Sequence, residues 1–131
     1  DKVTVSTMAD AVMVPLDMVT EIKAAVSQAL LNSELHAGLE ARMWILLEEE
    51  GNELIVSVRD NGRGMNREEV RAALQAGRMG IRHSIMGRIQ DLGGSARLHS
   101  APGRGVEWEL RVPLLMHETT PSDDSRPGSE E

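Results

Sequence analysis

The sequence has no cysteine, tyrosine or phenylalanine, and only two tryptophans among its 131 residues. Without cysteine there can be no disulfide framework and no thiolate-ligated metal site. A surface that stacks nucleic-acid bases needs aromatic side chains, and this chain has almost none to offer. We therefore expect no nucleic-acid partner and a core made of Val, Leu, Ile, Met and Ala.

Long apolar runs are also missing. None approaches the ~18–20 residues of a membrane span, and the first residues lack the charged-then-apolar layout of a signal peptide. We expect a soluble, cytoplasmic domain with no membrane contact of its own. The length fits one compact domain.

Charge is distributed unevenly along the chain. Residues 1–58 carry three basic and ten acidic groups, residues 59–113 carry ten and six, and residues 114–131 carry one and five. The basic residues of the middle segment are all arginine. Such a segment suits a small polyanion held at one place, although scattered surface arginines are the plainer interpretation.

The apolar patterning predicts an α+β domain over residues 1–113. Strands are expected at 2–8, 42–49, 54–60, 96–100 and 106–112, and helices at 16–36, at 68–75 and from near Ile81 to a Gly-Gly pair at 93–94. This order predicts a two-layer sandwich, with a mixed, mainly antiparallel sheet and helices on one face. Residues 114–131 are polar, acidic and rich in Pro and Gly, and are expected to form a disordered tail.

Three groups of residues could carry chemistry. Gln28, Asn32 and His36 recur every four residues along the long helix and share a stripe that faces either water or a site. Residues 60–64 (Asp-Asn-Gly-Arg-Gly) end a strand, and Asp60 shares the face of its apolar neighbours, so its carboxylate needs a donor. The exocyclic amino group of a bound adenine is one such donor, whereas guanine's carbonyl would be repelled; a plain Asn-Gly turn is the alternative.

The third group is residues 77–80 (Gly-Arg-Met-Gly), which precede the last expected helix. Free N–H groups at a helix start can hold phosphate, and nearby arginines add positive charge, although glycine is common in any loop. No Gly-Lys pair exists, which rules out the standard P-loop. The four histidines show no metal-ligand spacing.

Taken in order, these motifs resemble the catalytic ATP-binding domain of sensor histidine kinases. This domain belongs to the superfamily (GHKL) that gyrase, the heat-shock chaperone and the mismatch-repair ATPases share. The resemblance covers roughly residues 3–113 and implies the Bergerat ATP-binding fold with ATP and Mg²⁺ as cofactors. It also implies that Asn32 coordinates the magnesium, that His36 lies near the phosphates and that Asp60 recognises the adenine amino group.

The short stretch between Met65 and Gly80 looks like the reduced ATP lid of the subfamily whose response regulators carry helix-turn-helix domains. The resemblance implies that Gly62, Gly64 and Met65 shape the pocket wall. It implies further that Gly80, with Ile81 and Arg82 after it, holds phosphate beneath the lid, and that Arg88 stabilises this segment from behind.

The chain departs from the family pattern at three positions. Gln28 stands where the family usually has Glu, so we expect slow hydrolysis of ATP by water, while phosphoryl transfer relies more on positioning and metal electrostatics. Val106 replaces a threonine whose hydroxyl helps to bind adenine through water. Arg78 stands where the family has the first glycine of its second glycine box.

The function implied is that of a protein-histidine kinase. The domain would donate the γ-phosphoryl group of ATP to a histidine on a dimerisation domain of the same homodimeric parent, whose cognate response regulator is an indirect partner. Because His83 is a poor acceptor, this segment alone is not expected to autophosphorylate. The alternative is a degenerate ATP-binding regulatory module without turnover; an ATP-hydrolysing machine is disfavoured by Gln28 and the short lid.

Overall fold

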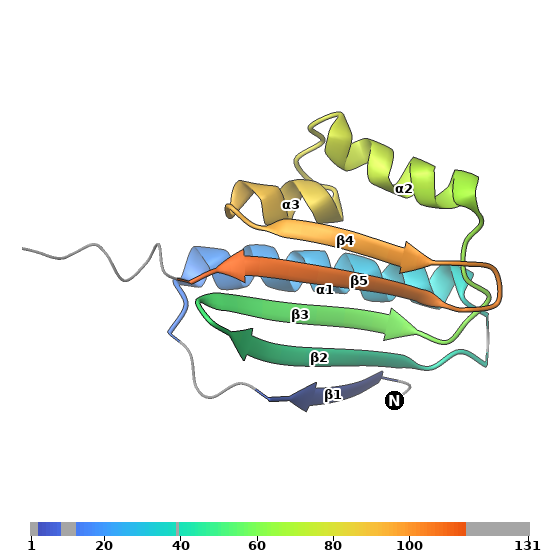
Figure 1. The fold of residues 1–131 in the computed structure, drawn as a ribbon, viewed down its shortest axis with the longest axis horizontal. Helices are drawn as coiled ribbons and strands as arrows, with labels where there is room; N and C mark the ends of the chain where they lie inside the picture. Colours follow the sequence, from blue (N-terminus) through green and yellow to red (C-terminus); the bar gives the residue numbers. More distant parts are fainter. Residues whose placement is uncertain (1–2, 9–12, 39, 115–131) are drawn as a thin grey trace, which may run out of the picture.

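The computed structural model describes residues 3–8, 13–38 and 40–114. It confirms the expected α+β fold with two layers (Figure 1). The strands are β1 (Val3–Thr7), β2 (Met43–Glu50), β3 (Glu53–Asp60), β4 (Ser95–Ser100) and β5 (Val106–Pro113). The helices are α1 (Leu16–His36), α2 (Arg67–Arg78) and α3 (Ile85–Asp91).

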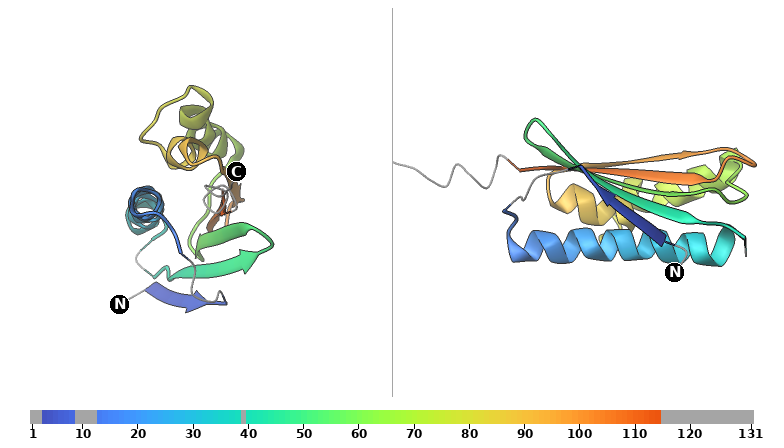
Figure 2. Two further views of the ribbon diagram at one scale, coloured as in Figure 1. Left: turned by 90° about the vertical axis from the view of Figure 1, so that its left-hand side faces the viewer. Right: turned by 90° about the horizontal axis from the view of Figure 1, so that it is seen from below.

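The strands form one five-stranded sheet in the order β1-β2-β3-β5-β4. β1 runs parallel to β2, and the other neighbours pair antiparallel, so the sheet is mixed and mainly antiparallel as predicted. α1 and α3 lie on the same side of this sheet (Figure 2). β3 is central, and its last residue, Asp60, pairs with Met43 of β2 beside the start of β5.

The core lies between α1, α3 and the inner face of the sheet. Period-two alternation buries the inward residues of β3 and β5, and Leu110 and Val112 are fully buried. On α1 the buried stripe comprises Met18, Ile22, Ala25, Ala29 and Ser33. Leu114, which we assigned to the tail, is buried at 7% exposure; residues 115–131, the rest of that expected tail, lie outside the described residues.

Two helix boundaries differ from the prediction. α3 begins at Ile85 rather than near Ile81, because Ser84 caps it: its Oγ accepts from Gly87 N at 2.9 Å, while Ser84 N donates to Ile81 O. α2 continues to Arg78, so Gly77 lies inside a helix instead of preceding one. A Cβ on Gly77 would lie 2.4 Å from Met86 Cβ, so glycine here lets α2 approach the start of α3.

The cap at Ser84 gives a first testable prediction. Ser84→Ala should lower the free energy of unfolding by about 1 kcal/mol, because the N–H of Gly87 loses its acceptor. Urea denaturation measures this, with Ser27→Ala, at an exposed serine within α1, as the control that leaves stability unchanged or slightly raised. Equal stability of Ser84→Ala and the unsubstituted chain would contradict the role assigned to this cap.

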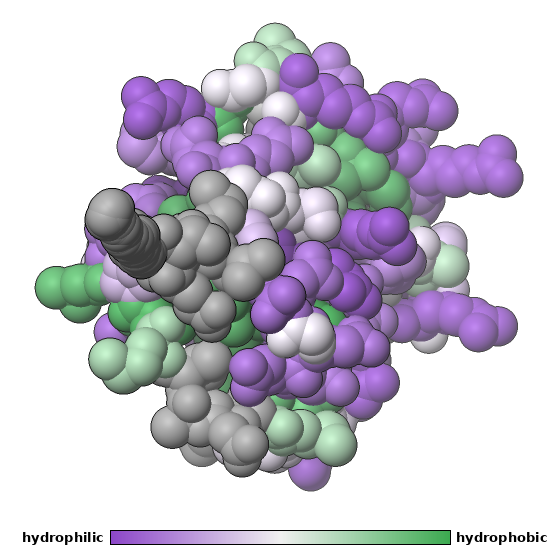
Figure 3. Space-filling view, turned by 60° about the vertical axis from the view of Figure 1, so that its left-hand side comes forward, coloured by the Kyte–Doolittle hydropathy of each residue, from purple (hydrophilic) through white to green (hydrophobic). Residues whose placement is uncertain are grey.

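Large apolar side chains that remain exposed are found on β1 and just after it, on α1 and just before it, and between α2 and α3. They are Val5, Met8, Met13, Leu16, Leu31, Leu35, Met79 and Ile81. Figure 3 shows one face, on which hydrophilic side chains predominate and apolar ones lie among them. Of the helices in the described ranges, none has both the length and the apolar character needed to cross a bilayer.

Candidate functional site

A cavity of about 260 Å³ opens between the second half of α1, the end of β3 and the start of β5. Five of the expected site residues line it, namely Asn32, His36, Asp60, Gly64 and Met65, and so does Val106, one of the three departures from the family pattern. They come from segments far apart in the chain, and the sheet register brings them together. The stripe on α1 therefore faces a site over its last two turns, rather than bulk water alone.

Asp60 is the most buried polar side chain at this cavity, at 2% exposure. Its Oδ1 accepts from the backbone N–H groups of Gly62 at 2.8 Å and Val106 at 3.2 Å. Its Oδ2 accepts from Ser33 Oγ at 2.6 Å. These three donors compensate the burial of the carboxylate and fix its orientation toward the cavity.

The two glycines after Asp60 are required by close contacts within the chain. A Cβ on Gly62 would lie 2.4 Å from the Cβ and carbonyl oxygen of Ala37, at the end of α1. Gly64 has a φ of +74°, and its Cβ would lie 2.0 Å from the carbonyl oxygen of Ala101. The loop is thus pressed between α1 and the β4–β5 turn, with Gly64 in the cavity wall and Gly62 donating to Asp60.

Arg63, between these glycines, ties the loop to the end of α1. Its Nε donates to the carbonyl oxygen of His36 at 2.6 Å, and its backbone N–H donates to the carbonyl oxygen of Ala37 at 3.2 Å. A cation at a helix C-terminus is also favoured by the helix dipole. Arg63 therefore holds the turn of α1 that bears Asn32 and His36 against the cavity.

Ser100, the last residue of β4, bonds to two segments that adjoin the cavity. Its Oγ accepts from the N–H of Met65 at 2.9 Å and donates to the carbonyl oxygen of Gly105 at 2.5 Å. One hydroxyl thereby joins the segment after the second glycine to the β4–β5 turn. Met65 is fixed in the wall by its backbone, at the start of the segment that leads into α2.

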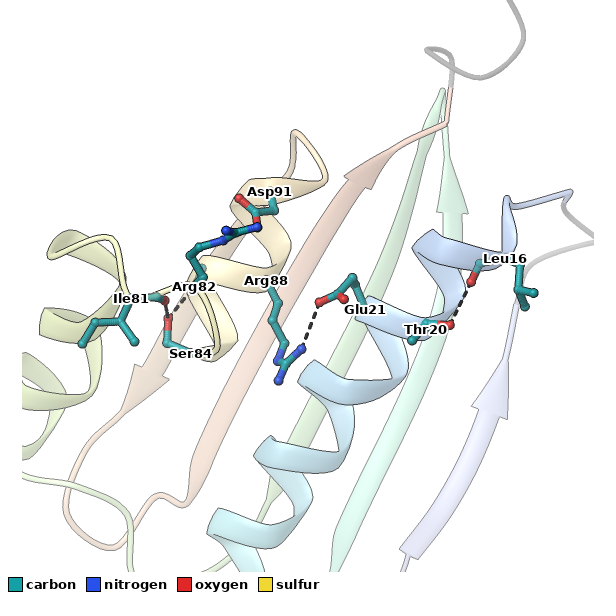
Figure 4. Close-up of polar contacts among 9 residues, drawn as sticks. Leu16, Thr20, Glu21, Ile81, Arg82, Ser84, Arg88 and Asp91 are labelled. Atoms are coloured by element: carbon teal, nitrogen blue, oxygen red, sulfur yellow. Dashed lines mark hydrogen bonds and ion pairs between the residues drawn. The ribbon is translucent and has the colours of Figure 1, made fainter.

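The remaining expected site residues do not line this cavity. Gln28 is half-buried on α1, and Gly80 is exposed with a φ of +75°. Figure 4 shows that Arg82 reaches along α3 to Asp91, at 3.7 Å, and that Arg88 crosses to Glu21 of α1, at 3.0 Å. The Arg88 pair accordingly holds α3 on α1.

The structure adds lining residues that the sequence analysis did not select, chiefly Ser33, Arg63, Glu69 and Trp108. Ser33 continues the buried stripe that Ala25 and Ala29 begin, each four residues after the last. A polar residue on an apolar stripe needs a partner, so this position carried a readable signal. Glu69 gave no such signal, because it serves the capping box of α2 with Asn66.

A metal ion at this cavity would have few protein ligands. The described residues contain no group of three or more His, Asp or Glu side chains that could hold a metal ion. The side-chain oxygen of Asn32 is a hard, neutral ligand of the kind that Mg²⁺ accepts, and Mg²⁺ usually keeps several waters and binds substrate phosphates. The residues present thus fit a metal held jointly with a bound polyphosphate.

A comparison with protein families gives a match over most of the chain. The model described as "Histidine kinase-, DNA gyrase B-, and HSP90-like ATPase" matches residues 18–116. A curated relative, sensor histidine kinase LiaS of Bacillus subtilis (strain 168), is 29% identical over 93 residues, which are 71% of this chain and 24% of the relative. The chain therefore spans about a quarter of the length of that protein.

Solved structures give a consistent result. The histidine kinase domain of the blue-light activated histidine kinase from Erythrobacter litoralis EL346 has a TM-score of 0.65 and 26% identity, covering 88% of this chain and 53% of that one. The ATP binding domain of PrrB from Mycobacterium tuberculosis has a TM-score of 0.65 at 21% identity, covering 87% and 82%. At 21% identity, the similarity to the PrrB domain supports the fold alone.

Proposed function

Because the chain belongs to the family of histidine kinase-, DNA gyrase B- and HSP90-like ATPases, we propose that it is the ATP-binding catalytic domain of a sensor histidine kinase. It binds Mg-ATP and donates the γ-phosphoryl group to a histidine on a dimerisation domain of the parent protein. The observation that carries this proposal is the buried Asp60 carboxylate, held by three donors in the wall of a cavity that Asn32 and His36 also line.

The base is recognised at Asp60. The remaining acceptor capacity of its carboxylate faces the cavity and takes a hydrogen bond from the exocyclic amino group of adenine. Gly64 and Met65 form the adjoining wall, and Gly62 supplies one of the N–H groups that orient Asp60. Val106 offers its backbone N–H to Asp60 but no side-chain hydroxyl to the base.

The phosphates lie toward the last turns of α1. Asn32 would hold a Mg²⁺ ion, which would compensate the charge of the phosphates, and His36, one turn further on, would lie beside the phosphate chain. ATP supplies the phosphoryl group, and the protein contributes positioning and charge compensation. Gln28 carries a neutral amide that cannot take a proton from water, so hydrolysis is slow while transfer to histidine proceeds.

Gly80, Ile81 and Arg82 hold phosphate from the segment between α2 and α3. Here the N–H of Gly80 donates to the carbonyl oxygen of Gly77 at 3.1 Å, so Gly80 would have to give up this bond in order to hold phosphate. Arg88 contributes indirectly, by keeping α3 fixed to α1 through Glu21. Residues 65–80 serve as the short lid.

The parent protein is a cytoplasmically exposed homodimeric kinase in this proposal. Its dimerisation domain carries the acceptor histidine, and its response regulator, with a helix-turn-helix output domain, receives the phosphoryl group afterwards. Support for these partners comes from the resemblance of the chain's motifs to sensor histidine kinases, the class named for the curated relative.

Two measurements test the proposal. Calorimetric titration with a non-hydrolysable ATP analogue in Mg²⁺ should give saturable binding. Incubation with γ-labelled ATP and the parent's dimerisation domain should then label a histidine on that domain, while the chain alone should acquire no label. Binding without transfer would instead favour the regulatory module without turnover. The departures from the family pattern at Gln28 and Val106 are the features that favour this alternative. Absence of binding would refute ATP recognition altogether.

A further inference from the structure

Two polar side chains are buried in the described part of the chain, and they touch each other. Ser33 is 9% exposed and Asp60 is 2% exposed. Ser33 Oγ donates to Asp60 Oδ2 at 2.6 Å, a short bond to a charged acceptor, which is the strong type. Both residues line the same cavity.

The hydrogen-bond capacity of this pair is nearly used up. A carboxylate has about four lone-pair directions. Oδ1 fills two with the N–H groups of Gly62 and Val106, and Oδ2 fills one with the hydroxyl of Ser33. One acceptor direction is left, on Oδ2. The Ser33 hydroxyl has a single hydrogen, which it uses in the hydrogen bond to Asp60. Toward any other group the Ser33 oxygen can therefore only accept.

This wall of the cavity therefore presents acceptors and no side-chain donor from the pair. A purine with an amino group at C6 can donate a hydrogen bond to this wall. A purine with a carbonyl at C6 would instead place an acceptor oxygen beside Asp60 Oδ2 and Ser33 Oγ, which are both acceptors, and would be repelled. If Ser33 lost its hydroxyl, a water could enter beside Oδ2. A water has two protons, so it could donate to the carboxylate and to a C6 carbonyl at once.

We propose that Ser33 is a positioning residue that determines base selectivity: its hydroxyl donates a hydrogen bond to Asp60, leaves the carboxylate one acceptor direction, and occupies the place beside Oδ2 that a donating water would otherwise take. The inference rests on the proposed function, since it assumes that the base of ATP reaches Asp60. Ser33 acts through Asp60 and is distinct from the residues that contact the phosphates.

The experiment compares the dissociation constants of ATP and inosine triphosphate, which differ at C6, in Mg²⁺. Ser33→Ala should weaken ATP binding several-fold, because an ordered water beside Oδ2 then competes with the adenine amino group, and should weaken inosine triphosphate much less, so the selectivity ratio falls. Ser27→Ala, an exposed serine on the same helix, should leave the ratio unchanged. Ser33→Thr keeps the hydroxyl and should retain most of the selectivity.

The outcomes separate the two levels of the argument. Equal weakening of both nucleotides by Ser33→Ala would mean a merely structural role and would overturn this inference alone. Failure of the unsubstituted chain to bind either nucleotide would overturn the proposed function and the inference with it. Should Ser33→Ala not fold, Ser33→Cys takes its place: the thiol is only a weak donor, so the selectivity ratio should fall, and an unchanged ratio would overturn the inference.

Discussion

Asp60→Asn is expected to weaken the binding of ATP about a hundredfold. The amide keeps its oxygen toward the N–H groups of Gly62 and Val106, since both need an acceptor. Its NH₂ group then replaces Oδ2 and points at Ser33 and the cavity. The bond to the adenine amino group is lost and a donor faces a donor. One lost bond to a charged group costs about 1.5–3 kcal/mol, and about 2.8 kcal/mol is a hundredfold in affinity.

Calorimetry with the non-hydrolysable ATP analogue measures this effect. Asp17→Asn is the matched control, because Asp17 is exposed in the first turn of α1, at the other end of this helix from the cavity. Circular dichroism at the temperature of titration establishes that both variants are folded. A dissociation constant of Asp60→Asn within threefold of the unsubstituted chain would show that the base does not bind at Asp60.

Asp60 could be identified from the sequence because strand periodicity is a local property. Counting by two from Val56 and Val58 places the carboxylate on the buried face, and the structure has it there. The long helix was equally predictable, since no Gly or Pro interrupts residues 16–36. In both cases the pattern within one element decides which side chains point inward.

What failed depended on contacts between elements or on competing local hydrogen bonds. The isoleucine spacing continues the helical period back to Ile81, but Ser84 donates to Ile81 O and caps the helix at Ile85 instead. Gly77 is expected in the loop before a helix, whereas it lies inside α2. Its lack of a side chain allows α2 to pack against Met86. The spacing of apolar residues in the sequence does not show how strongly a capping residue stabilises a helix start, nor how closely another helix packs.

The β4–β5 turn illustrates how such tertiary contacts hold the site, and it carries the prediction with the largest effect on stability. Gly105 has a φ of +72°, and a Cβ placed on it would lie 2.0 Å from the backbone carbonyl oxygen of Asp60. Gly103, two residues earlier, has a φ of +78° and nothing within 4 Å of its Cβ position. The two glycines share a backbone conformation and differ in the space around them.

Alanine substitution at these two positions therefore distinguishes the free-energy cost of a left-handed backbone from the cost of a steric clash with β3. Gly103→Ala should cost only the left-handed backbone strain, about 1–2 kcal/mol. Gly105→Ala adds the displacement of β5 from the end of β3, a further 1–3 kcal/mol of overpacking, and should lower the melting temperature by more than about 10 °C.

Gly105→Ala should also weaken ATP binding in the fraction that remains folded, because moving the carbonyl of Asp60 disturbs the bond from Val106 N to its carboxylate. Thermal melts followed by circular dichroism measure the stabilities, and calorimetry below the melting transition measures the affinity. Equal melting temperatures for the two variants would mean that β5 yields to the extra methyl group without cost. In that event the close approach of β5 to β3 would not constrain the Asp60 carboxylate, which we propose to bind the base.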